Sequence, residues 1–414
     1  MRRPADRGVS RRGFLMGGAA AGVGAVGGMS LSLLTDPHAS GPAPADAPPP
    51  TPPTAATPEG RRRVAFHGRH QPGITTPPQA AITYVALDLD ETTDRAALRQ
   101  LLQLLSDDAE RLMRGEPALA DLEPELAAPE ASLTVTFGFG PELVRRVAGD
   151  SAVPGWLRPL PRFAIDRLEP GWSGGDLLLQ VGSDDSLTLA HAVRVLLRDS
   201  RAFARPRWTQ HGFRRPPTTG MIGTRNHFGQ VDGTSNPVPG TADFDAAVWT
   251  HDGPGWLADG TSLVLRRIRM DMDGWDKTDR HSREQSVGRS LATGAPLTGA
   301  TEIDDPDLDA VGPTGFPVIH DLAHVRSARV NAAERRIFRR AYNYAEGPDS
   351  SSPGQLFASY QADVDRQFVP IQERLSAADL LNQWTTPVGS GVYALPGGCR
   401  PGSYVGEPLF ATGV

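Results

Sequence analysis

The feature that most limits how this chain can fold is a repeated order of strand-like and helix-like patterns. In the first half, apolar and polar side chains alternate in stretches typical of strands, and leucines recur at helical spacing between them. The alternation is clearest in SLTVTFGF, residues 132–139. The predicted order is strand, helix, strand, strand and helix, over residues 82–89, 94–114, 132–139, 176–182 and 187–203. This order is typical of a ferredoxin-like unit.

The second half repeats this order less regularly. Its predicted strands and helices cover residues 262–270, 280–290, 336–344, 367–384 and 391–395. We therefore expect an α+β fold of two ferredoxin-like halves, residues 64–215 and 216–414, whose sheets face each other in a barrel-like arrangement. Two long stretches, 205–246 and 295–319, show no regular pattern, and loops of such length usually either serve a site or are disordered.

The first 45 residues have the three-part pattern of an export signal. Arg11 and Arg12 precede an apolar run, residues 16–34, that is rich in glycine and alanine. Because this run is too weakly apolar for a membrane-spanning helix, the pattern predicts a twin-arginine signal in residues 1–45. A linker of mostly proline and alanine follows in residues 46–63. We expect the twin-arginine translocase to export the folded protein, which is then secreted, periplasmic or associated with the cell envelope.

Composition excludes several classes of site. The net charge of −6 argues against a nucleic-acid partner. The single cysteine, Cys399, excludes a disulfide framework, a thiolate zinc cluster and an iron–sulfur cluster held by cysteines. The one GxGxxG motif lies inside the export signal at residues 22–27, and the sequence has no P-loop, HExxH or GxSxG motif.

Asp232 is the first candidate for chemistry. It lies between glycines in GQVDGTSNP, residues 229–237, where glycine allows backbone conformations that other residues resist. An acid on such a turn is either a catalytic group presented to a ligand or an Asx-turn that caps a loop. The pattern alone leaves both readings open.

Histidines and arginines supply the other candidates. His320 and His324 have helical spacing, but a metal site of two histidines lacks a third ligand, whereas haem needs only one axial histidine. The run 335–344 combines four arginines with a strand-like alternation. In a strand, Arg339 and Arg340 face opposite sides, so only one of them can serve a site.

Ordered motifs in the second half resemble those of the dye-decolorising peroxidases. GQVDG, residues 229–233, resembles the GxxDG signature of that family, and the flanking segments RNHFG and GTSNP fit the same pattern. Further similar segments follow in the family's order, at residues 263–289, 294–297, 324, 339–344 and 389–397. The resemblance runs from about His67 to near the C-terminus, and the export signal is similar to that of the exported bacterial branch.

The resemblance implies one haem b per chain, bound between sheet and helices and contacted by motifs of the second half. It implies His324 as the iron ligand, Asp232 as the distal acid and Arg339 as the distal arginine. It implies a hydrogen bond between Asp379 and the iron-binding histidine, with the carboxylate as acceptor. Further haem contacts are implied for Gly233, Thr234, Ser235, Arg289, Arg329, Val330 and Asn331. The chain departs from the family's usual residues at Gln230-Val231 and at Arg329-Val330-Asn331.

The implied function is a peroxidase that reduces hydrogen peroxide and oxidises aromatic, dye-type or other one-electron donors through a ferryl intermediate. The expected reductant is a small aromatic molecule or one that docks on the surface, and the oligomeric state is left open. The alternatives are a deferrochelatase, which releases iron from haem, and an exported haem-binding protein without turnover. Because an aspartate with an ordinary pKa of about 3.9 acts as a base in acid, we expect an activity optimum at roughly pH 4–5.

Overall fold

The computed structural model describes residues 62–215, 223–347 and 352–412. The expected export signal and nearly all of the linker lie outside these residues. Among the described residues, no helix combines the length and the apolar character that crossing a membrane requires.

The first half of the chain forms four antiparallel strands with helices on one face. The strands are β1 (Ala81–Leu89), β2 (Thr134–Phe139), β3 (Leu177–Ser183) and β4 (Ala204–Phe213). The helices are α1 (Arg95–Met113), α2 (Pro141–Ala148) and α3 (Ser186–Ser200). The strand order β2-β3-β1-β4 is that of a ferredoxin-like unit. Asp94 and Asp185 begin α1 and α3, where each side chain accepts a hydrogen bond from a backbone N–H of the first turn.

The second half has the same strand order, β9-β10-β7-β11. These strands are β7 (Thr261–Met270), β9 (Tyr342–Glu346), β10 (Ser352–Gln361) and β11 (Thr385–Leu395). The short strands are β5 (Thr224–Arg225) and β6 (Val231–Asp232), which pair with each other, and β8 (Phe338–Arg339), which pairs with β10. The helices are α4 (Ala242–Val248), α5 (Met272–Asp276), α6 (Arg280–Val287), α7 (His324–Ala328), α8 (Val369–Ala378) and α9 (Glu407–Ala411).

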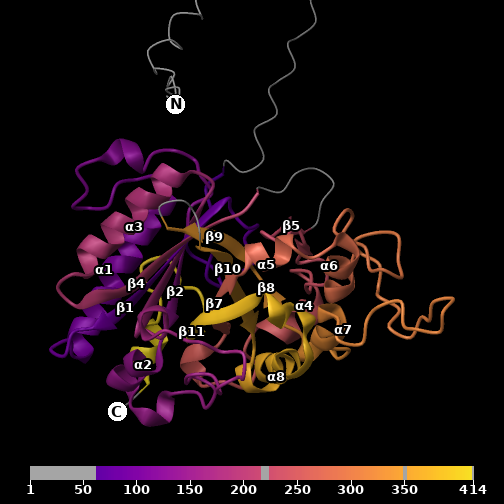
Figure 1. Ribbon diagram of the computed structural model, residues 1–414. Helices are drawn as coiled ribbons and strands as arrows, with labels where there is room; N and C mark the ends of the chain where they lie inside the picture. The colour runs from indigo at the N-terminus through magenta and orange to yellow at the C-terminus, as the bar shows by residue number, and fades with distance from the viewer. Residues whose placement is uncertain (1–61, 216–222, 348–351, 413–414) are drawn as a thin grey trace, which may run out of the picture. The chain divides into compact units, whose positions relative to one another are not determined.

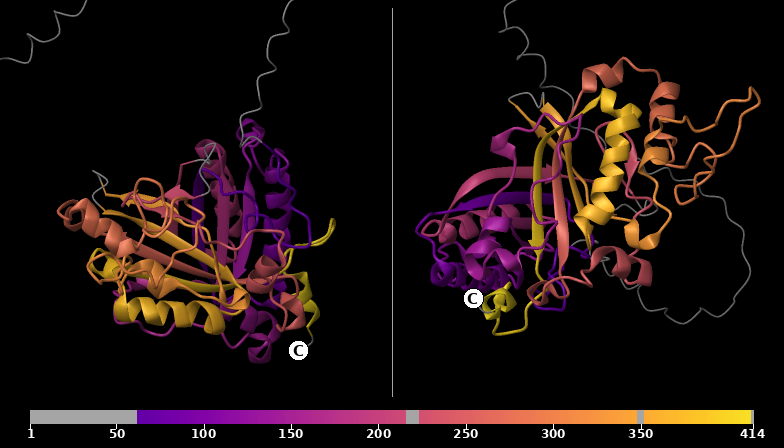
Figure 2. Two further views of the ribbon diagram at one scale, coloured as in Figure 1. Left: turned by 90° about the vertical axis from the view of Figure 1, so that its right-hand side faces the viewer. Right: turned by 90° about the horizontal axis from the view of Figure 1, so that it is seen from below.

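The two half-sheets join into one closed, barrel-like sheet. β11 meets β2 through the pair Ala394 and Phe139, and β4 meets β9 through Phe213 and Asn343. β7 pairs with both β10 and β11, which closes the ring. Figure 1 shows the strands in the centre, with α1 and α3 on one side and α6, α7 and α8 on the other, and Figure 2 shows the same layers from two further directions. The expected α+β fold of two ferredoxin-like halves is therefore confirmed.

Alternation along the strands separates two cores. On β1, Val85 and Leu87 face the apolar core beneath α1 and α3, whereas Tyr84 and Ala86 face the second core between the half-sheets. The second core is rich in tyrosine, and it contains Tyr84, Tyr342, Tyr344, Tyr360 and Tyr393. Strands that bury both faces in this way hold the loops of the second half on a rigid support.

Some local expectations were wrong. Residues 205–246 are not a continuous loop, because β4 extends to Phe213 and α4 lies near the end of the stretch. The strand expected over 336–344 is broken at Arg340-Ala341, which separates β8 from β9. The helix expected over 367–384 is in fact a π-helical turn, then α8, then a 3-10 turn. β10 had not been predicted, since its segment begins SPGQ and breaks the alternation with proline and glycine.

Candidate functional site

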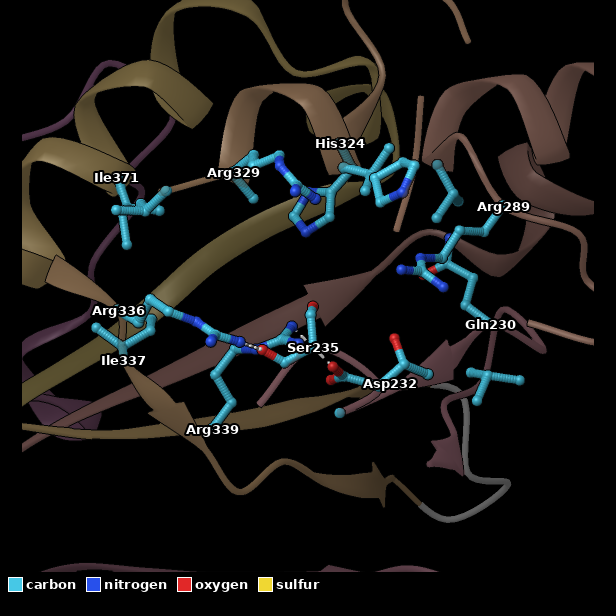
Figure 3. Close-up of a pocket in the computed structure, with 18 of the residues that line it drawn as sticks. Gln230, Asp232, Ser235, Arg289, His324, Arg329, Arg336, Ile337, Arg339 and Ile371 are labelled. Atoms are coloured by element: carbon cyan, nitrogen blue, oxygen red, sulfur yellow. Dashed lines mark hydrogen bonds and ion pairs between the residues drawn. The ribbon is translucent and has the colours of Figure 1, made fainter. Parts of the chain in front are cut away.

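A cavity of ≈ 590 Å³ lies in the second half, between β8 and β10 on one side and α7 and α8 on the other. It is lined by every residue for which the resemblance implied a haem contact: Gly233, Thr234, Ser235, Arg289, Arg329, Val330 and Asn331. Asp232, His324 and Arg339 line it as well. Figure 3 shows His324 on one wall and Asp232 with Arg339 on the facing wall. The structure thus brings together residues that lie up to about a hundred positions apart in the sequence.

Asp232 and Arg339 form an ion pair at the cavity wall. The distance from Asp232 Oδ1 to Arg339 Nη1 is 2.8 Å, and the two side chains are 15% and 22% exposed. Asp232 ends β6, and the turn that follows requires a positive φ of 97° at Gly233, which glycine adopts without strain. The next arginine, Arg340, directly follows β8 and is buried on the side away from the cavity, where it donates a hydrogen bond to Gln79 Oε1 at 2.6 Å. Of these two adjacent arginines, only Arg339 lines the cavity, as expected for neighbours in extended backbone.

His324 is oriented by Asp379. Asp379 is 9% exposed as a whole residue, and its Oδ2 lies 2.6 Å from His324 Nδ1. The other carboxylate oxygen accepts a hydrogen bond from the backbone N–H of Leu381 at 2.9 Å. Burial lowers the pKa of His324, but the charge and the hydrogen bond of Asp379 outweigh it and raise this pKa overall. A proton held on Nδ1 leaves Nε2 with the lone pair that an iron ligand needs.

Arginines and apolar side chains complete the cavity. The apolar part of the wall includes Val287, Ile337, Phe357, Ile371 and Leu375. Arg289, Arg329 and Arg336 lie at the same cavity, and burial together with the cation of Arg339 lowers the pKa of Arg289. A site with more cations than carboxylates suits a ligand that carries negative charge.

The residues present fit a haem group. A flat macrocycle suits the apolar wall, its two carboxylates suit the arginines, and Nε2 of His324 suits the iron. Gln230 adds a further observation, because its side chain lines the cavity and its Nε2 is buried without a hydrogen-bond partner among the described residues. A bound group with acceptor oxygens would satisfy such a donor. The chain's departures from the family's usual residues, at 230–231 and 329–331, thus still lie at the cavity.

Sequence reasoning missed residues that contact Asp232 and Arg339. Gln355 Nε2 donates to Asp232 Oδ2 at 3.3 Å, but Gln355 lies on β10, which had not been predicted. The sequence indicates Asn236 only as part of the GTSNP segment, yet its amide contacts the main chain of Arg339. Its position four residues after Asp232 in the signature segment is the one signal that could have drawn attention to it.

Comparisons with known proteins agree with this site. Residues 71–214 match the family model of the N-terminal domain of Dyp-type peroxidases, and residues 223–400 match that of the C-terminal domain. The chain is 36% identical to the dye-decolorizing peroxidase of Thermobifida fusca, over 97% of both chains. It is 32% identical to the deferrochelatase of Escherichia coli O6:K15:H31, over 86% of this chain and 90% of that protein.

Solved structures show the same similarity. The crystal structure of a DyP-type peroxidase from Cellulomonas bogoriensis superposes with a TM-score of 0.81 at 52% identity, covering 85% of this chain and 99% of that one. Ferric DtpA from Streptomyces lividans gives a TM-score of 0.82 at 42% identity, covering 86% of this chain and 100% of that one. Together with the cavity and its histidine, these matches show that the chain belongs to the Dyp-type peroxidase family of haem enzymes.

Proposed function

We propose that this enzyme reduces hydrogen peroxide and oxidises aromatic or dye-type one-electron donors, with Asp232 and Arg339 acting on the peroxide and His324 binding the iron. The observation that carries the proposal is the 2.8 Å ion pair of Asp232 and Arg339, which faces His324 across the cavity. When bound, the haem supplies a redox-active iron with one open coordination position.

Reduction of hydrogen peroxide breaks the O–O bond and consumes two electrons and two protons to give two water molecules. Asp232 would accept a proton from one peroxide oxygen and return it to the other, which turns a poor leaving group into water. Arg339 would stabilise the negative charge that develops on the departing oxygen, since a guanidinium stays protonated and donates in a fixed direction. Asp379 would hold His324 in the tautomer that binds iron.

Variants of the ion pair test this proposal. We expect Arg339→Leu to lower the rate constant for reaction with one equivalent of peroxide by about 10²–10³-fold, followed by stopped-flow absorbance of the haem-loaded protein. Asp232→Asn should lower it as well, because an amide cannot accept the proton. The matched control is Arg335→Leu, which removes an exposed arginine nearby. Full activity in Arg339→Leu would contradict the assigned role.

A second candidate, release of iron from haem, is favoured by relatives of 31–32% identity that carry the name deferrochelatase. That reaction exchanges iron(II) for two protons and yields the free porphyrin. Incubating the haem-loaded protein with a reductant and an iron(II) chelator, then measuring porphyrin fluorescence, separates the two activities. A haem carrier without turnover would show neither activity and would tolerate Arg339→Leu.

We also propose that the twin-arginine translocase exports the protein. Support comes from the sequence, in which Arg11 and Arg12 precede a weakly apolar run. Replacing both arginines with lysine should leave the chain in the cytoplasm, as judged by cell fractionation. Unchanged export of that variant would refute the assignment.

A further inference from the structure

The side-chain amide of Asn236 binds the main chain of Arg339 on both of its polar groups. Asn236 Nδ2 donates to the carbonyl oxygen of Arg339 at 2.7 Å, and Asn236 Oδ1 accepts from the backbone N–H of Arg339 at 3.1 Å. These two bonds reproduce the pairing that a neighbouring strand would offer. The amide thus holds one residue with both its nitrogen and its oxygen.

β8 depends on this contact because it is only two residues long. On its other edge the strand pairs with β10, where Arg339 lies opposite Ser359 and the N–H of Arg340 donates to Ala358 at 2.8 Å. The main-chain groups of Arg339 itself point away from β10, toward Asn236. Without Asn236, both groups of Arg339 would lose the partners the structure gives them.

Asn236 also belongs to the loop that carries Asp232. Its backbone N–H donates to the carbonyl oxygen of Gly233 at 3.1 Å, which closes the turn immediately after Asp232. One side chain thus ties the segment bearing the carboxylate to the strand bearing the guanidinium, 103 positions away in the sequence. Asp232 is also bound from β10, because Gln355 Nε2 donates a hydrogen bond to its second carboxylate oxygen, Oδ2, at 3.3 Å.

We propose that Asn236 is a positioning residue that sets the geometry of Asp232 and Arg339, an inference that rests on the proposed function of that pair. Charge stabilisation falls steeply with misplacement, so a guanidinium that shifts with its main chain loses its effect on the peroxide. The ion pair alone does not fix this geometry, because it joins the tips of two side chains whose main chains could still move.

Three variants separate positioning from plain stabilisation. Asn236→Ala removes both bonds to Arg339, whereas Asn236→Asp keeps the acceptor for the N–H and loses the donor to the carbonyl. The matched control is Asn343→Ala, which removes a largely buried amide whose Nδ2 donates to the carbonyl oxygen of Arg225 at 3.0 Å. The control bond also ties a strand of the second half to the segment before Asp232, but it does not contact Arg339.

Two measurements report on the relative positions of Asp232 and Arg339. The first is kcat/KM for hydrogen peroxide, compared with KM for the electron donor. The second does not depend on turnover: it is the dissociation constant of cyanide from the ferric haem-loaded protein, titrated by absorbance, since hydrogen cyanide must give up a proton and bind as an anion beside Asp232 and Arg339. Haem content and the unfolding temperature are recorded for each variant.

We expect Asn236→Ala to lower kcat/KM for peroxide by about 10–100-fold and to weaken cyanide binding, with the KM for the donor unchanged. In both kcat/KM for peroxide and the affinity for cyanide, Asn236→Asp should lie between wild type and Asn236→Ala. It tests the positioning role if the alanine variant does not fold. Asn343→Ala should lower the unfolding temperature about as much as Asn236→Ala does. It should leave kcat/KM for peroxide and the dissociation constant of cyanide near their wild-type values. If the Asn236 variants change the two measurements no more than Asn343→Ala does, Asn236 only stabilises the loop.

Arg339→Leu distinguishes this failure from failure of the proposed function. If Arg339→Leu lowers the peroxide rate and cyanide affinity but the Asn236 variants do not, the positioning role alone is refuted. If Arg339→Leu changes neither quantity, the role of the ion pair is refuted, and the positioning role is refuted with it.

Discussion

Replacing Asp108 with asparagine should change how the stability of this enzyme depends on pH. Asp108 lies on α1 and is only 1% exposed. Burial raises its pKa to about 7 from an ordinary 3.8, and a hydrogen bond and charge repulsion from Asp199 on α3 add to the rise. The two helices pack against each other, so the pair lies at their contact.

The direction of this pH dependence follows from how many protons the folded and unfolded states bind. Between pH 3.8 and about 7, the folded state keeps the proton on Asp108, whereas the unfolded chain releases it. The free energy of unfolding therefore falls as the pH rises through this window, and the contribution is lost above pH 7. Since one pKa unit corresponds to about 1.4 kcal/mol, this group makes the folded state about 4 kcal/mol less stable at pH 8 than at pH 4.

Asparagine keeps an N–H donor toward Asp199 and has no proton to lose. We expect Asp108→Asn to match wild type at pH 4 and to be more stable by up to about 4 kcal/mol at pH 8. The assay is guanidinium unfolding of the haem-loaded protein at both pH values, in which the contribution of haem cancels between variant and wild type. The control is Asp107→Asn on the same turn, whose carboxylate is 46% exposed and pairs with Arg111 at 2.9 Å. A variant that is less stable than wild type at pH 8 would refute the reasoning, because it would mean that the ionised carboxylate is stabilised in the fold.

Three further changes have defined outcomes. Asp379→Asn should weaken haem binding by about 10–100-fold, measured by haem transfer to apomyoglobin, because His324 loses the carboxylate that orients it. Gly288→Ala should lower the free energy of unfolding by more than about 1 kcal/mol, since φ is +86° there and a Cβ would lie 2.4 Å from a side-chain carbon of the neighbouring α7. Asp166→Ala should cost about 3–5 kcal/mol, because it leaves the buried Arg266 without its carboxylate partner. Peroxidase activity should peak in acid, as expected when a carboxylate moves the proton.

Each of these four predictions would be contradicted by a specific result. Unchanged haem transfer in Asp379→Asn would mean that packing alone orients the histidine. If Gly288→Ala has the same free energy of unfolding as wild type, α6 and α7 can move apart enough to accommodate the added Cβ without cost. For the buried pair, Asp166→Leu combined with Arg266→Met should be better tolerated than Asp166→Ala, and the reverse order would contradict the argument from an uncompensated charge. An activity maximum above neutral pH would count against Asp232 as the proton carrier.

The sequence predicted the fold class well and individual strands less well, for physical reasons. β1 and β2 bury apolar side chains on regular positions, so their alternation is visible in the sequence. β4 reads ARPRWTQHGF, with several exposed positions and a proline at a register shift against β1, and its pattern is lost. The missed β10 carries Gln355, so the hydrogen bond to Asp232 could not be foreseen. Strand alternation did separate Arg339 from Arg340, because Arg340 follows β8 directly and its N–H still donates to Ala358 on β10, so the two side chains point to opposite sides.

The break after α8 shows why a helical pattern alone could not reveal how Asp379 meets His324. A continuous helix over 367–384 would hold Asp379 in helical backbone, with its side chain directed by the helix. In the structure α8 ends at Ala378, and Asp379 adopts extended backbone with φ −108° and ψ 124°. One carboxylate oxygen then caps the following turn at Leu381, which leaves the other to meet His324 at 2.6 Å. The same feature that interrupts the helix therefore positions the carboxylate, and substitutions that extend α8 through residue 379 should displace it from His324.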